Sequence, residues 1–220
     1  MENNITLKFN DSLLIDSSDI IANYVELGID SVLEDGIFKE VPVVSTILSI
    51  NKVFLSIHER NLVKNLILFL NELNTGDINR KKLEKYKEKL NNNKKIAEKE
   101  LGRVLIILNQ TIDNEKTIMM GKLFKSYINE QINWSMFCEF SEIVNRIFIQ
   151  DVFILKKIYV ENINCTSGMM EIYRVERLNS LGIIGLTTKT MVIGNQGGSR
   201  TDSYIALNKM GKHFCAIVFS

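Results

Sequence analysis

The sequence has few of the residues that interrupt helices or assemble catalytic and metal sites. Its 220 residues include one proline, Pro42, and two histidines, His58 and His213. Scarce proline favours long helices, because proline ends helices and is more typical of chains rich in strands or linkers. Neither histidine has a suitable partner three or four residues away, so the sequence predicts no metal site.

Cysteine is equally scarce, with Cys138, Cys165 and Cys215 far apart and no C-x-x-C pair. This spacing excludes a zinc framework or a redox motif, and the odd count argues against a secreted disulfide scaffold. Cys215 lies two residues from His213, and residues two apart on a helix do not face each other, so no nucleophile pair is predicted. The amino terminus lacks a basic stretch followed by an apolar core, so we expect a cytoplasmic protein.

Neither sign of charge dominates the chain. Twenty-seven basic residues against 26 acidic ones give a formal charge of +1, so no overall field indicates nucleic acid or anionic lipid as a partner. The most basic stretch, residues 80–103, also carries glutamates at helical spacing, which favours a solvated face that pairs with itself. With 45% hydrophobic residues, the composition is that of a folded globular chain.

Long uninterrupted apolar runs are also missing. The longest apolar region, 41–57, contains Ser45, Ser49, Asn51 and Lys52, and falls short of the roughly 18 apolar residues of a spanning helix. We expect a buried core helix here. The alternative is a membrane-active helical hairpin over residues 41–70, whose candidate inserting residues are Val44, Ile47, Leu48 and Phe54.

Apolar residues at spacings of three and four predict a succession of amphipathic helices up to about residue 160. The first predicted helix follows the cap Ser17-Ser18-Asp19, the second runs from Pro42 to Ile57, and the third covers residues 62–73 after the polar elbow 58–61. Near residues 91–93 the sequence predicts either a solvated helix pair or a hinge. Further helices are predicted from about Asn114 after Asp113, after the cap Asn133 and after the cap Asp151. They predict a helical bundle domain over residues 1–150.

From Cys165 the pattern changes to helix, β-hairpin, helix. A helix carrying Ile172, Val175 and Leu178 ends at Leu181-Gly182, and residues 186–193 and 204–207 read as strands. The glycine-rich segment 194–199 between them predicts a hairpin loop and not a phosphate-binding loop, because a strand follows it. Asn208 caps a last helix. The fold prediction is therefore mainly α, with a winged-helix-like domain over residues 151–220.

This second module raises the hypothesis of DNA binding. Its candidate contacts are Arg174 and Arg177 on the helix before the hairpin, and Arg200 on the wing. Six basic residues against three acidic ones from residue 165 onward give a charge of +3, which is modest for neutralising phosphates. Winged-helix layouts also serve as protein-interaction modules, and a fold does not fix a function.

An ordered series of segments carries a family resemblance: residues 113–124, then Phe137 with Phe140 and Ser141, then 151–155, 178–183 and 204–211. Over about residues 114–220 the chain resembles the bacterial abortive-infection alpha proteins. The resemblance implies an apolar amino-terminal region, a helical core, a small winged-helix-like end and an association with phage resistance.

Taken together, these patterns predict a non-enzymatic host-defence protein of bacteria that acts by interaction. We expect a protein partner or a second copy of the chain, no cofactor and no metal. The alternatives are a winged-helix DNA-binding regulator and a membrane-active effector that inserts the 41–70 hairpin when triggered.

Overall fold

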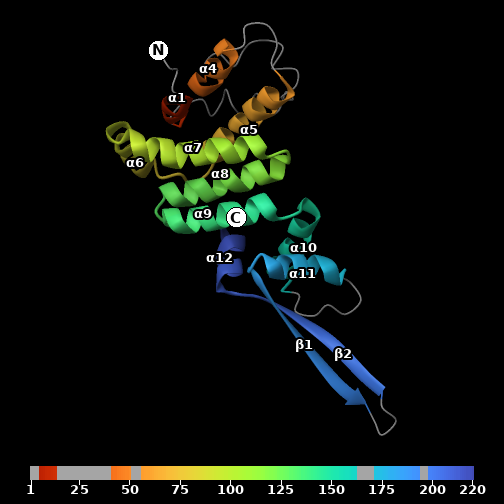
Figure 1. Ribbon diagram of the computed structural model, residues 1–220. Coiled ribbons are helices and arrows are strands. Elements are labelled where there is room, and N and C mark those ends of the chain that lie inside the picture. Colours follow the sequence, from red (N-terminus) through yellow and green to blue (C-terminus); the bar gives the residue numbers. More distant parts are fainter. Residues whose placement is uncertain (1–4, 14–40, 51–55, 163–170, 194–197) are drawn as a thin grey trace. The chain divides into compact units, whose positions relative to one another are not determined.

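A computed structural model describes residues 5–13, 41–50, 56–162, 171–193 and 198–220. The fold is mainly helical, and an antiparallel two-stranded hairpin flanked by helices lies near the carboxyl terminus (Figure 1). The chain divides into two compact units, residues 1–138 and 139–220. The predicted fold class, a helical bundle followed by a winged-helix-like module, is confirmed.

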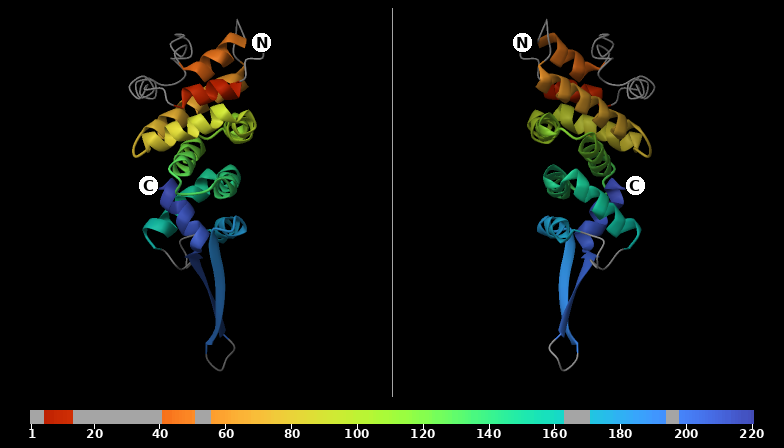
Figure 2. Two further views of the ribbon diagram at one scale, coloured as in Figure 1. Left: turned by 90° about the vertical axis from the view of Figure 1, so that its left-hand side faces the viewer. Right: turned by 90° about the vertical axis from the view of Figure 1, so that its right-hand side faces the viewer.

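The described residues of the first unit are mostly helical, and short connections join the helices from α5 onward. Their bounds are α1 (Ile5–Ser12), α4 (Pro42–Ile50), α5 (Ile57–Asn74), α6 (Arg80–Asn92), α7 (Lys94–Gln110), α8 (Asn114–Ile128) and the first residues of α9 (Trp134–Arg146). Helix α5 packs against both α7 and α8, and α1 packs against α4, α6 and α7 (Figures 1 and 2). The predicted helix after Ser17 lies outside the described residues.

A chain of buried phenylalanines forms the centre of this unit. The ring of Phe69 on α5 lies 5.8 Å from that of Phe9 and 5.5 Å from that of Phe124. The ring of Phe124 in turn lies 5.6 Å from that of Phe137. All four side chains are fully buried. Aromatic pairs at these separations add to the hydrophobic free energy of burial, so they fix the helices against one another.

Helix α5 begins earlier than the sequence pattern indicates. Ser56 and Glu59 form a capping box, in which the Ser56 hydroxyl accepts from the Glu59 N–H at 3.3 Å and the Glu59 carboxylate accepts from the Ser56 N–H at 2.7 Å. The polar elbow expected over 58–61 is therefore wrong, because those residues form the first turn of α5. Helix α4 begins at Pro42 as predicted and extends to Ile50, and residues 51–55 are not described.

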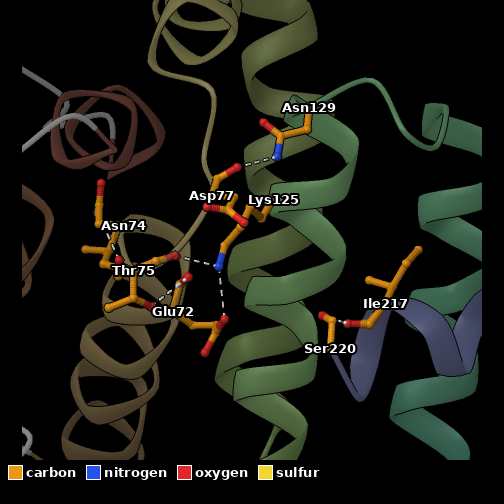
Figure 3. A network of polar contacts seen from close by, with 9 residues as sticks. Glu72, Asn74, Thr75, Asp77, Lys125, Asn129, Ile217 and Ser220 are labelled. Atoms are coloured by element: carbon orange, nitrogen blue, oxygen red, sulfur yellow. Dashed lines mark hydrogen bonds and ion pairs between the residues drawn. The ribbon is translucent and has the colours of Figure 1, made fainter.

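The charged stretch forms two helices that meet at Asn93, which confirms the predicted helix pair. Asn93 ends α6, and its side chain accepts from the Ile96 N–H at 3.2 Å to begin α7. A second set of polar contacts holds the loop before α6 on the end of α8 (Figure 3). Lys125 donates to the Glu72 carboxylate at 3.1 Å and to the Thr75 carbonyl at 2.7 Å, while the Asn129 amide donates to the Asp77 carbonyl at 3.0 Å. These contacts set where α6 lies beside α8.

The second unit contains the remainder of α9, then α10 (Ile149–Val160), α11 (Ile172–Ser180), β1 (Ile184–Ile193), β2 (Gly198–Leu207) and α12 (Lys209–Val218). The two strands pair antiparallel from Ile184 with Leu207 to Ile193 with Gly198. Asn208 caps α12 as predicted, because its side-chain oxygen accepts from the Gly211 N–H at 2.8 Å. Helix α11 ends at Ser180, and Leu181 caps it; the next residue, Gly182, has a φ of 73°, a conformation that favours glycine.

Two features at the start of this unit differ from the sequence pattern. The predicted domain boundary lies after residue 150, and the division between the two compact units lies before Glu139, within α9. The reason is packing: the ring of Phe140 lies 5.4 Å from that of Phe214 and 5.7 Å from that of His213. Asp151 was expected to cap α10, but Phe148 holds that position and Asp151 is buried in the first turn.

Candidate functional site

Arg177, one of the three candidate DNA contacts, is engaged within the second unit. Its guanidinium forms two hydrogen bonds with the Asp151 carboxylate, at 2.8 and 2.6 Å, and so joins α11 to α10. These bonds hold the pKa of Arg177 above its ordinary value. A bidentate pair of this kind fixes the plane of the guanidinium, so Arg177 has a packing role in addition to any role in binding.

The other two candidate arginines lie on different elements, one on α11 and one on β2. Arg174 on α11 is paired with Glu171 and donates to the Tyr173 hydroxyl at 3.2 Å. The hydrogen bond from Tyr173 and the pairing with Arg174 lower the pKa of Glu171. Arg200 lies on β2 opposite Met191, and its side chain is outside the described part of the structure. The role of these arginines in DNA binding stays a prediction.

The same helices expose aromatic side chains. Phe148 and Tyr173 are 55% and 48% exposed, and we call these two residues the α10–α11 aromatic surface. The guanidinium of Arg177 lies beside both rings, with its carbon 4.4 Å from the Phe148 ring centre and 5.2 Å from the Tyr173 ring centre. Such stacking is favourable for arginine and keeps the rings in place.

Two of the four candidate membrane residues are buried inside the first unit, and the side chains of the other two are not described. Val44 and Ile47 on α4 are 0% and 5% exposed, and the Val43 N–H donates to the Ser12 hydroxyl of α1 at 3.0 Å. Leu48 belongs to α4, but its side chain is not described, and Phe54 lies outside the described residues. Within the described ranges, no helix has both the length and the apolar character needed to cross a membrane.

A cleft in the first unit combines aromatic and basic side chains. It has a volume of about 580 Å³ and is bounded by α6, by Glu100 of α7, by the end of α8 and by residues 130–134. Three lysines of α6, spaced on one face of the helix, line it: Lys82, Lys85 and Lys89. Its aromatic residues are Tyr86, Tyr127 and Trp134. We call it the α6–α9 cleft.

Glu100 is the buried carboxylate of this cleft, and only 5% of the residue is exposed. One of its oxygens accepts from the hydroxyls of Tyr86 and Tyr127, each at 2.9 Å, and the other accepts from the Lys89 ammonium at 3.0 Å. Burial and the nearby carboxylate both raise the pKa of the two tyrosines, so they remain protonated donors. The charge of Glu100 is therefore balanced by three donors from α6 and α8.

At the rim of the cleft, Lys82 forms an ion pair with Glu130 at 2.9 Å and donates to the Asn129 carbonyl at 2.7 Å. The hydrogen bond from Lys82 lowers the pKa of Glu130. Three further polar groups that line the cleft, the ammonium of Lys85, the side-chain amide of Gln131 and the indole N–H of Trp134, form no hydrogen bond or ion pair with any described residue.

The sequence analysis missed this cleft because it interpreted the stretch 80–103 as a solvated face. One signal was available: Glu100 lies three residues after Ala97 and four before Val104, on the apolar stripe of α7. A glutamate on such a stripe must find donors when the helix packs. The donors come from α6 and α8, and nothing in the sequence shows which residues of those helices supply them.

The nucleophilic and metal-ligating residue types do not gather. Cys215 is fully buried, and burial raises the pKa of its thiol to about 12, which makes it a poor nucleophile. The His213 ring lies against Phe140 instead. Among the residues that the structure describes, no three His, Cys, Asp or Glu side chains lie close enough together to hold a metal ion.

In comparisons with known proteins, no family model, no curated protein and no solved structure matches this chain.

Proposed function

We propose that this chain is a non-enzymatic interaction protein of bacterial phage defence, acting in the cytoplasm by binding a protein partner through its second unit. The defence context rests on the resemblance of residues 114–220 to the abortive-infection alpha proteins. The interaction rests on the α10–α11 aromatic surface.

That surface carries the proposal because exposed aromatic groups beside a fixed arginine are the composition of a protein-binding site. Aromatic residues and arginine are enriched where protein interfaces are most strongly bound, and full burial of one large apolar side chain contributes about 1.5–3 kcal/mol. The pair with Asp151 holds Arg177 in place before any partner arrives. Little side-chain entropy is then lost on binding, which favours affinity.

The engagement of reactive groups in packing supports a non-enzymatic role. Asp151 is tied to Arg177, Glu100 to two tyrosines and a lysine, and the Cys215 thiol is buried. Each of these groups stabilises the fold in its present contacts.

The test is a phage plating assay on bacteria that express the chain or one of two variants. Tyr173→Asp places a charge on the aromatic surface, and Ile106→Asp is the control, because both side chains are large and exposed but Ile106 lies on α7 of the first unit. We expect the wild type to lower the plating efficiency of at least one phage, Tyr173→Asp to restore it at least tenfold, and Ile106→Asp to behave as the wild type.

Two results would contradict the proposal. If the wild-type chain protects against no phage in a broad panel, the defence role is wrong. If Tyr173→Asp protects as well as the wild type at equal protein level, the aromatic surface is not the binding site. Sedimentation of the purified chain tests whether the partner is a second copy, since that partner gives a dimer that Tyr173→Asp dissociates.

A further inference from the structure

The α6–α9 cleft of the first unit has the dimensions of a small-molecule site. Its volume of about 580 Å³ lies inside the range of about 300–1,000 Å³ that is usual for ligand pockets. Lys82 of α6 donates to the Asn129 carbonyl at the end of α8, and the Asn129 amide donates to the Asp77 carbonyl in the loop before α6, so two walls of the cleft are joined without a ligand. The site is therefore largely formed in advance.

Both carboxylates of the cleft are already paired with lysines, so they favour no bound cation. Glu100 is already neutralised by Lys89 and accepts from two tyrosine hydroxyls, and Glu130 at the rim is paired with Lys82. Three lysines against two glutamates leave one positive charge in excess among the lining residues, that of Lys85. Its ammonium is exposed and makes no ion pair with a described residue.

The groups that remain to bind a ligand are hydrogen-bond donors and aromatic rings. Lys85, Gln131 and the Trp134 N–H all supply donors that no described residue uses. The Trp134 ring is only partly buried, and it stacks on Phe137 with ring centres 5.0 Å apart, which fixes its plane. Donors beside a fixed indole match a ligand that has negatively charged oxygens next to a planar ring.

We infer that the α6–α9 cleft binds a nucleotide, with the base against Trp134 and the phosphate against Lys85. Gln131 supplies an amide that donates to and accepts from the edge of the base or the sugar. The role of Glu100 is to position: it holds Tyr86, Tyr127 and Lys89 together as the floor. This site is independent of the α10–α11 aromatic surface.

Intrinsic fluorescence can report on this site, because Trp134 is the single tryptophan of the sequence. In the experiment, AMP and ATP are titrated into the purified full-length chain while the tryptophan fluorescence is recorded, and calorimetry is run in parallel. Adenosine and inorganic phosphate are titrated separately. We expect a saturable fluorescence change with the nucleotides at micromolar concentration, and binding at least tenfold weaker with either adenosine or phosphate alone.

A pair of charge variants on α6 provides the control. Lys85→Glu lies in the cleft, whereas Lys81→Glu makes the same charge change on the same helix outside it, and both lysines are exposed. We expect Lys85→Glu to weaken AMP binding at least tenfold and Lys81→Glu to change it less than twofold. Gln131→Ala, at an exposed loop position, is expected to weaken binding by a smaller factor without affecting the fold.

The bound nucleotide is either a free mononucleotide or the terminal nucleotide of a single strand. A short 5′-phosphorylated oligonucleotide, added to the titration, distinguishes these two ligands. Competition between AMP and the oligonucleotide, with both weakened by Lys85→Glu, supports the site and identifies the tighter of the two as the ligand. The inference is overturned if neither ligand produces a saturable change at millimolar concentration, or if Lys85→Glu and Lys81→Glu bind equally well.

Discussion

Tyr86 illustrates how single residues keep a charge inside the first unit. Its hydroxyl donates to the carboxylate of Glu100, a residue that is only 5% exposed, so removal of that hydroxyl leaves a largely buried charge with fewer donors. We expect Tyr86→Phe to lower the free energy of unfolding by about 1.5–3 kcal/mol, the usual range for hydrogen bonds to charged groups.

Urea denaturation measures this change, with Tyr173→Phe as its control. The Tyr173 hydroxyl also donates to a glutamate, Glu171, but both residues are exposed, and water replaces the lost bond. We expect Tyr173→Phe to stay within about 0.5 kcal/mol of the wild type. Equal effects of the two substitutions would show that the Glu100 network adds no stability.

Cys215 and Cys138 should differ in chemical reactivity. Burial raises the pKa of the Cys215 thiol from 9.0 to about 12, whereas Cys138 is only partly buried. In a Cys165→Ser background at pH 8, we therefore expect iodoacetamide to modify Cys138 first and Cys215 only on unfolding, as measured by peptide mass spectrometry. Because the folded-state pKa is the raised one, Cys215 favours folding fully below pH 9, and this contribution is lost as the pH rises toward 12. Rapid native-state modification of Cys215 would contradict its burial.

At the scale of elements, helix starts and stops could be predicted because their signals are local. Asn93, Asn133 and Asn208 accept from N–H groups three residues onward, which is the bond expected of a cap. The capping box at Ser56 was equally local, and it was missed because the polar residues after it resembled an elbow.

The candidate sites could not be predicted, because their partners come from distant parts of the chain. Asp151 and Arg177 are 26 residues apart, and Tyr127 and Glu100 are 27 apart. The sequence shows that each residue is charged or polar but not which side chain it meets, so Asp151 was taken for a cap and Glu100 for a surface residue.

Alanine substitutions at two helical glycines should change the free energy of unfolding in opposite directions. In Gly211→Ala, the new Cβ would lie 1.9 Å from the Ile183 carbonyl oxygen, where α12 meets the start of the hairpin. That oxygen belongs to the backbone and accepts from the Asn208 N–H, so it has little room to move. We expect a loss of roughly 3 kcal/mol in the free energy of unfolding.

Gly102→Ala is the comparison, since a Cβ on Gly102 in the middle of α7 meets nothing within 4 Å. Alanine favours a helix interior over glycine by about 0.5–1 kcal/mol, so this variant should be stabilised by that amount. Both changes are measured by urea denaturation. A Gly211→Ala protein as stable as the wild type would show that α12 does not approach Ile183 closely.

At the scale of the whole molecule, the DNA-binding alternative predicts a protein that protects one genomic site with nanomolar affinity at physiological salt. We expect no such site in a footprinting experiment, because Arg177 is paired with Asp151 and Arg174 with Glu171. Should a site be found, Arg174→Ala combined with Arg200→Ala is the informative variant. Arg177→Ala leaves Asp151 unpaired and destabilises the second unit, so its loss of binding would not distinguish contact from folding.

The membrane alternative, insertion of the 41–70 hairpin, requires α4 and most of α5 to leave the interior of the first unit, and burial opposes this. Val44 and Ile47 are already removed from water, so their transfer to lipid gains little hydrophobic free energy, while the phenylalanine and asparagine contacts around α5 are lost. We therefore expect the purified chain to release no dye from anionic liposomes at neutral pH.

Ile47→Asp should unfold the first unit, because it buries an unpaired carboxylate and so lowers the free energy of unfolding by on the order of 4 kcal/mol or more. Ile106→Asp, at an exposed position, should leave the melting temperature nearly unchanged. Dye release by the wild type that disappears in Leu48→Lys would instead show that α4 inserts, since a lysine resists entry into hydrocarbon.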